Sequence, residues 1–174
     1  MTKAVISTIG HDRPGLVSDI SAVATDLGLN IEDSRMTVLG GEFAVLMAVE
    51  GSDTALETFN NNMSELCAGA DLAYIFRRTQ QPADKVPSRL YSASIVALDH
   101  PGIVHAIAGF FSARGINIRD LHTETTPAAH TGTPIFNITL IAEIPQTLRL
   151  HDVKEAFEHF CVEADLDGRL EPLR

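Results

Sequence analysis

Two short segments of this chain carry residues suited to holding a small charged molecule. They are Asp12-Arg13-Pro14-Gly15 and Asp99-His100-Pro101-Gly102, and each is followed by a second element, Gly28-Leu29-Asn30-Ile31 or Gly115-Ile116-Asn117-Ile118. Gly and Asp favour turns that expose backbone amides, and an Asn side chain both donates and accepts hydrogen bonds. This combination is typical of recognition of a carboxylate and an ammonium group.

The elements around these segments explain how they would bind an anion. Asp12 and Asp99 are predicted to cap a helix, with Pro14 and Pro101 in its first turn, where the missing N–H costs nothing. Amides at the positive end of that helix favour a carboxylate. We therefore predict ten ligand-binding residues, five in each half: Asp12, Gly15, Leu16, Val17 and Asn30, and Asp99, Gly102, Ile103, Val104 and Asn117.

Each of these residues also has a purely structural interpretation. Asp12 and Asp99 could cap the helix and do nothing more, and Gly15 and Gly102 could serve only the turn. The two asparagines could hydrogen-bond only to the strand that they open. Both interpretations stay open at the level of the sequence.

Motifs for catalysis are absent from the sequence. It contains no Gly-x-Gly-x-x-Gly, no Walker-type Gly-Lys-Ser/Thr, no Gly-x-Ser-x-Gly and no His-Glu-x-x-His. Neighbouring carboxylates such as Glu32 and Asp33 alternate across a strand and would not converge on one substrate. The histidines do not stand at metal-site spacings. We predict that the chain is not an enzyme and holds no metal and no cofactor.

Charge and hydropathy limit the partners. The formal net charge is −10, from 23 acidic and 13 basic residues. Affinity for nucleic acid comes from neutralising phosphates, so no direct binding to nucleic acid is expected, and no membrane binding. The first residues lack an apolar segment of signal-peptide length, and no run of about 18 apolar residues follows. These features favour a cytoplasmic protein.

An internal repeat organises the whole chain. Gly15 and Gly102 lie 87 residues apart, as do Asn30 and Asn117. Beyond the asparagines the spacing grows by six residues, which places an insertion in a turn between residues 127 and 134 of the second half. The two halves are therefore duplicates.

Each half reads as a strand, a helix, a hairpin, a helix and a short final strand. The apolar spacing and turn residues predict first strands at 3–9 and 91–98, a first helix over 14–27 ended by Gly28, hairpin strands at 30–39 and 42–50 joined by Gly40-Gly41, second helices at 54–67 and 148–161, and last strands near Asp71 and Asp165. The order is βαββαβ twice. The predicted class is α+β, with two ferredoxin-like domains whose helices cover one face of a four-stranded antiparallel sheet.

The boundary between the halves is set by composition. Residues 79–89 are polar and carry Pro82 and Pro87, which favours an extended linker between a first domain at 1–78 and a second at 90–174. Units this small bury a low fraction of their surface when alone. We therefore expect the domains to pack against each other as a pseudo-dimer.

The Asp-Arg-Pro-Gly-Leu-Val loop, the helix after it and the Gly-Leu-Asn-Ile element resemble the ACT domain, a ligand-binding regulatory module of amino-acid metabolism. Both halves show the pattern. Two such units without a third domain most resemble the glycine cleavage system transcriptional repressor group. The resemblance implies a regulatory protein that senses a small amino acid, glycine or a similar one, and controls a transcriptional regulator by protein contact.

Other functions remain open. One alternative is a protein-interaction module that binds no ligand. Another is a detached regulatory subunit of an amino-acid or folate pathway enzyme. The chain's assembly as a monomer or as a homo-oligomer is likewise open.

Overall fold

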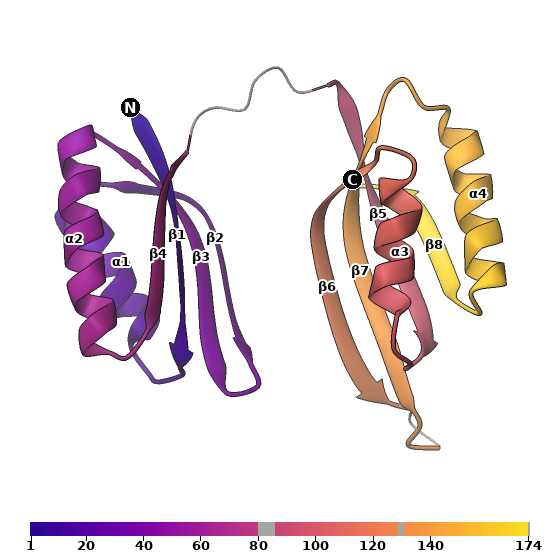
Figure 1. Cartoon of the computed structure of the whole chain (residues 1–174), viewed down its shortest axis with the longest axis horizontal. Helices are drawn as coiled ribbons and strands as arrows, with labels where there is room; N and C mark the ends of the chain where they lie inside the picture. Colours follow the sequence, from indigo (N-terminus) through magenta and orange to yellow (C-terminus); the bar gives the residue numbers. More distant parts are fainter. Residues whose placement is uncertain (80–85, 129–130, 174) are drawn as a thin grey trace. The chain divides into compact units, whose positions relative to one another are not determined.

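The computed structural model describes residues 1–79, 86–128 and 131–173 (Figure 1). The described residues show the βαββαβ order twice, as predicted. In the first unit the elements are β1 (Thr2–His11), α1 (Leu16–Asp26), β2 (Asn30–Leu39), β3 (Glu42–Gly51), α2 (Asp53–Gly69) and β4 (Ala73–Thr79). In the second they are β5 (Ser88–Leu98), α3 (Ile103–Ser112), β6 (Asn117–Pro127), β7 (Pro134–Pro145), α4 (Leu150–Glu163) and β8 (Asp167–Pro172).

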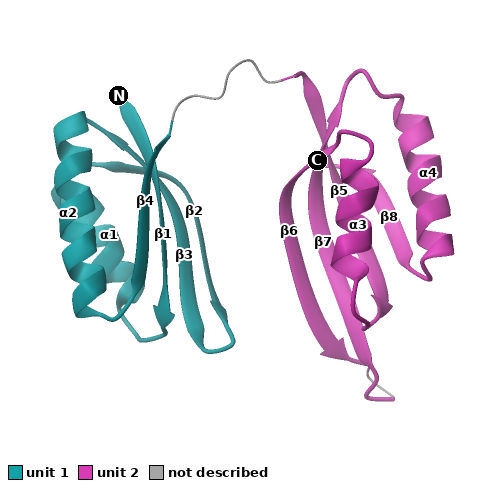
Figure 2. Ribbon diagram, in the orientation of Figure 1, with its two compact units in different colours: residues 1–82 teal, residues 83–174 magenta. Residues whose placement is uncertain are grey.

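The chain divides into two compact units, Met1–Pro82 and Ala83–Arg174, coloured separately in Figure 2. Of the predicted linker, Thr79 closes β4 and Ser88 opens β5, while residues 80–85 lie outside the described residues. The domain boundaries and the pseudo-dimeric packing stay predictions, and each unit is described here by itself.

Each unit contains one antiparallel sheet with its helices on one face (Figure 1). The strand orders are β2-β3-β1-β4 and β6-β7-β5-β8. Along β1, Ala4, Ile6 and Thr8 are buried under the helices while Ile9 is exposed, which is the alternation expected of a sheet covered on one side. The predicted ferredoxin-like class is confirmed.

The first hairpin turns at Gly40 and Gly41, whose φ angles are 63° and 92°. Positive φ at both central residues is the conformation that a Gly-Gly pair permits. Leu39 pairs with Glu42 in this hairpin, and the corresponding pair in the second unit is Thr126 with Ile135. The six additional residues therefore lie in the second hairpin turn, as predicted, although residues 129 and 130 of that turn lie outside the described residues.

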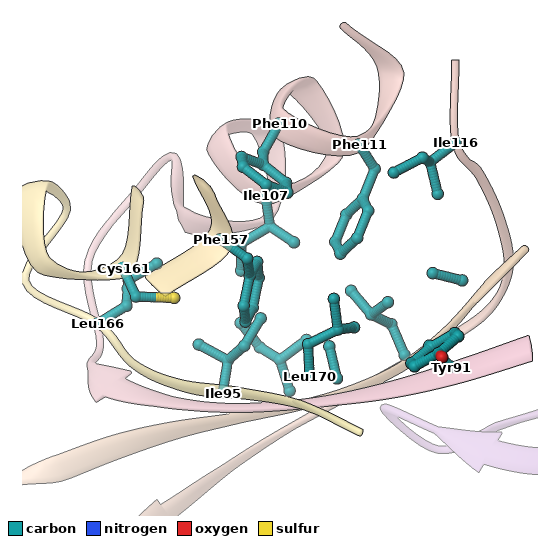
Figure 3. Packing of buried hydrophobic residues seen from close by; sticks show 14 of the residues in the cluster. Tyr91, Ile95, Ile107, Phe110, Phe111, Ile116, Phe157, Cys161, Leu166 and Leu170 are labelled. Carbon is teal, nitrogen blue, oxygen red and sulfur yellow. The ribbon is translucent and has the colours of Figure 1, made fainter. Parts of the chain in front are cut away.

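The cores of the two units are separate apolar clusters. In the second unit, Phe110 and Phe111 of α3 meet Phe157 of α4 over the sheet, where Ile95 and Leu170 lie beneath them (Figure 3). The ring centroids of Phe110 and Phe157 are 5.4 Å apart, edge to face. These contacts hold the last turn of α3 against the middle of α4.

Candidate functional site

The loop between the first strand and the first helix has the same conformation in both units, and it differs from the prediction. Gly15 and Gly102 are the N-cap residues, with φ of 93° and 99°, and neither helix has a side-chain cap. The prediction that Asp12 and Asp99 cap the helices is wrong. These residues lie three positions earlier, where the amide of Asp12 donates to the Gly41 carbonyl and that of Asp99 to the Pro134 carbonyl, each at 3.3 Å.

This geometry explains the two glycines. A left-handed N-cap favours a residue without Cβ, so Gly15 and Gly102 are required by the turn itself. Both are exposed, and apart from Gly102 itself and its two chain neighbours no heavy atom lies within 4 Å of the position that a Cβ would take there. The same turn therefore leaves the helix N-terminus open to solvent.

The amides available to an anion include that of Ser18, which the sequence analysis did not select. The first helical hydrogen bond runs from the amide of Asp19 to the carbonyl of Gly15, at 2.9 Å. Among the described residues, the amides of Val17 and Ser18 have no backbone acceptor. The Leu16 amide reaches the Arg13 carbonyl only at 3.5 Å. These amides at the positive helix end favour an anion.

Arg13 is a further residue of this loop that the sequence analysis did not select. Its Nη1 donates to the Pro14 carbonyl at 3.3 Å, and its Nη2 donates to Oδ2 of Asp19 at 2.8 Å. A guanidinium group, paired with the Asp19 carboxylate, therefore lies beside the helix N-terminus. In the second unit His100 takes this place, with Nδ1 3.1 Å from the Pro101 carbonyl oxygen. Aligning the repeat would have pointed to the pair, since Arg13 and His100 also lie 87 residues apart.

The two asparagines lie at the opposite end of their sheets from these loops. Asn30 pairs with Glu50, whose other neighbour is Lys3 at the start of β1, whereas His11 at the far end of β1 leads into the loop. The 11-residue helix α1 spans this separation, about 16 Å at 1.5 Å per residue. Within one unit the amides and the asparagine therefore do not form one pocket, because the helix that connects them runs the length of the sheet.

The surroundings of the two asparagines differ. Asn117 Nδ2 donates to Oε2 of Glu143 at 2.9 Å, beside a depression of about 230 Å³ lined by Val86, Ser88, Gly115, Asn117, Glu143 and Pro145. In the first unit, Lys3 Nζ lies 2.6 Å from Oε1 of Glu32. The hydrogen bond from Lys3 lowers the pKa of Glu32. The second unit thus presents a carboxylate, that of Glu143, which could accept from an ammonium group. Its counterpart in the first unit, Glu50, lies near the Lys3–Glu32 ion pair.

Nucleophilic and metal chemistry receive no support from the described residues. Cys67 and Cys161 are buried, and burial raises the pKa of both thiols, that of Cys161 to about 11. Within residues 1–79, 86–128 and 131–173, no three His, Cys, Asp or Glu side chains lie close enough to hold a metal ion. In the same ranges, every helix is too short or too polar to span a lipid bilayer.

Comparison with known families agrees with the topology. A family model described as ACT domain matches residues 2–76, and a second with the same description matches residues 91–158. The chain therefore belongs to the ACT-domain family, with two ACT domains in tandem.

The similarity to known proteins extends along almost the whole chain. The chain is similar to the glycine cleavage system transcriptional repressor of Escherichia coli (strain K12), with 30% identity over 167 residues, which is 95% of this chain and 87% of the repressor. It is also similar to the crystal structure of an unknown protein from Galdieria sulphuraria, at a TM-score of 0.84 and 28% identity over 99% of each chain. A candidate glycine cleavage system transcriptional repressor matches at a TM-score of 0.74 and 25% identity, covering 99% of this chain and 98% of its own. These similarities support a regulatory role.

Proposed function

We propose that this chain is a non-catalytic regulatory protein that binds a small amino acid, glycine or one of similar size, and controls a transcriptional regulator by direct protein contact. The observation that carries the proposal is the similarity to a transcriptional repressor of the glycine cleavage system along 95% of the chain. The net charge of −10 opposes direct binding to DNA. Contact with a DNA-binding protein is then the route by which such a chain would affect transcription.

The geometry of the first loop supports a carboxylate as the recognised group. Open amides at Val17 and Ser18 and the guanidinium of Arg13 lie together at the N-terminus of α1. A carboxylate matches both, because a helix N-terminus and a guanidinium fork each donate parallel hydrogen bonds. The carboxylate of Glu143 beside Asn117 is a partner for an ammonium group at the other end of a unit. The chain thus contains a group suited to each of the two charges of an amino acid.

Isothermal titration of the full chain with glycine, alanine, serine and acetate tests ligand binding. We expect one of the amino acids to bind and acetate, which lacks the ammonium group, to bind more weakly. Arg13→Gln should weaken binding roughly tenfold, because it removes a charge-assisted hydrogen bond. Arg35→Gln is a matched control: Arg35 is also an exposed arginine, with Nη1 2.6 Å from Oδ1 of a nearby carboxylate, Asp33. Absence of heat with every amino acid would contradict ligand sensing.

A pull-down from native cytosol with and without glycine tests the partner. Recovery of a DNA-binding regulator whose yield changes with glycine is the expected result. Recovery of an amino-acid or folate pathway enzyme in its place would favour the detached regulatory subunit.

A specific observation also favours the ligand-free interaction module. Gly15 and Gly102 are explained by their positive φ angles, and Asn117 already donates to Glu143. Under this alternative the partner would be recovered equally with and without glycine, and titration would show no binding.

A further inference from the structure

The two units differ at the place where their two helices approach each other. In the first unit the residue after α1 is Leu27, which packs on the core, and α2 is capped by Ser52, whose Oγ accepts from the Ala55 amide at 3.2 Å. In the second unit Arg114 occupies the position of Leu27. Helix α4 begins only at Leu150, which matches Leu56 in the repeat, so the first turn present in α2 is missing from α4.

A pocket of about 210 Å³ lies at this place in the second unit. It is lined by Arg114, Leu148, Arg149, Asp152 and Val153. It shares no lining residue with the depression around Asn117. Its volume is below the range of pockets that hold drug-sized molecules, so it suits a small metabolite.

Arg114 is exposed, but two contacts with Phe110 hold its guanidinium in position. Its Nη1 donates to the Phe110 carbonyl at 2.9 Å, and its Cζ lies 3.9 Å from the centroid of the Phe110 ring. Phe110 is itself fixed, because its centroid is 5.4 Å from that of Phe157 and 5.0 Å from that of Phe160 on α4. One hydrogen bond and one stacking contact thus orient the guanidinium and leave its other N–H groups free to donate.

The charges and the apolar wall of the pocket define its ligand. Arg114 and Arg149 supply two positive charges and Asp152 one negative charge, and no ion pair joins Asp152 to either arginine within the described residues. The three side chains together carry one positive charge, which favours a monoanion over a dianion. Leu148 and the buried Val153 provide an apolar surface beside these charges.

We propose that this pocket binds a small carboxylate that carries a short branched apolar chain. The carboxylate accepts hydrogen bonds from Arg114 and Arg149, and the chain packs on Leu148 and Val153. Two sources share this chemistry: a branched-chain amino acid, whose ammonium group lies at Asp152, and a simple carboxylic acid without an amine. The site belongs to the second unit alone and does not depend on the function proposed above.

The proposal is tested with the full chain by isothermal titration and by amide chemical-shift mapping. The probes are leucine, 4-methylpentanoate, which keeps the carbon skeleton without the amine, and 3-methylbutylamine, which lacks the carboxylate. Binding of either carboxylate, with shifts at the start of α4, supports the proposal. If leucine then binds the Asp152→Asn variant more weakly than the parent, the ligand is the amino acid. If 4-methylpentanoate binds the parent as tightly as leucine or more tightly, the ligand is the simple acid. Failure of both carboxylates to bind, or comparable binding of the amine, overturns the proposal.

Variants locate the site. Arg114→Leu introduces the residue found at the same repeat position of the first unit, and Arg149→Ala removes the second guanidinium at an exposed position. Each should weaken carboxylate binding roughly ten- to a hundredfold. Arg169→Leu, an exposed arginine on β8, should bind as the parent does. If Arg114→Leu lowers the melting temperature, the test depends on Arg149→Ala. An Arg149→Ala protein that binds the carboxylate as tightly as the parent would overturn the proposed site.

Discussion

Thr8 on β1 offers a direct test of the energetics of the first core. It is 3% exposed, and its Oγ1 has no hydrogen-bond partner among the described residues. The corresponding residue of the second unit is Ile95, which is 1% exposed. A buried hydroxyl without a partner costs about 1–3 kcal/mol. Thr8→Val keeps the β-branched shape and replaces the hydroxyl with a methyl group.

We expect Thr8→Val to raise the free energy of unfolding by about 1–3 kcal/mol. In the second unit, Ile95→Thr should be less stable than Ile95→Val by a similar amount, since those two variants differ only in the hydroxyl. Thr37→Val, on the exposed side of β2, is the control and should change stability by less than about 0.5 kcal/mol.

Urea unfolding followed by far-ultraviolet circular dichroism measures the effect. The midpoint should rise without a change in the slope m, because the native and unfolded surfaces are nearly unchanged. A Thr8→Val protein that is equally or less stable than the parent would refute the reasoning, since it would show that Oγ1 is hydrogen-bonded in solution.

Three further predictions concern the ligand, DNA and the thiols. Asn30→Ala and Asn117→Ala together should weaken amino-acid binding roughly ten- to a hundredfold with little change in melting temperature, measured by titration and thermal unfolding, with the exposed Asn61→Ala as control. If the double variant binds the amino acid as tightly as the parent, the asparagines are not part of the binding site. The purified protein should not shift duplex DNA in a gel at physiological salt, because its net charge of −10 repels phosphate, and a tight complex formed without a partner would contradict this. Because burial raises the pKa of Cys161 to about 11 and Cys67 is also buried, iodoacetamide should label both thiols only after unfolding, as read by mass spectrometry.

Much of the fold was predictable because its signals are local and occur twice. The Gly40-Gly41 turn and the alternation along β1 each depend on a few consecutive residues, and the repeat allowed every element to be identified from two copies. The ends of elements were less predictable. Helix α4 begins two residues after its predicted start, at Leu150, because the segment before it forms a turn in which the Leu148 amide donates to the Pro145 carbonyl.

The candidate site was predictable in composition but not in arrangement. The loops, the amides near Gly15 and Gly102 and the two asparagines were all identified from residue types. The role of Asp12 could not be identified in this way, because an Asp before a Pro-Gly pair is compatible both with a helix cap and with a strand end. In the structure its amide donates to the Gly41 carbonyl, so Asp12 lies at the end of the strand.

The order of elements, the duplication and the acidic charge follow from the amino-acid sequence alone, because periodicity, turn residues and composition require no knowledge of distant contacts. Spatial relations required the folded chain. Only the tertiary structure places Asn30 and Gly15 at opposite ends of one sheet, since the direction of α1 along that sheet sets the distance between them. Likewise, the sequence shows only that Arg114 stands where the first unit has Leu27. Arg114 becomes part of a pocket because the shorter α4 leaves space beside it.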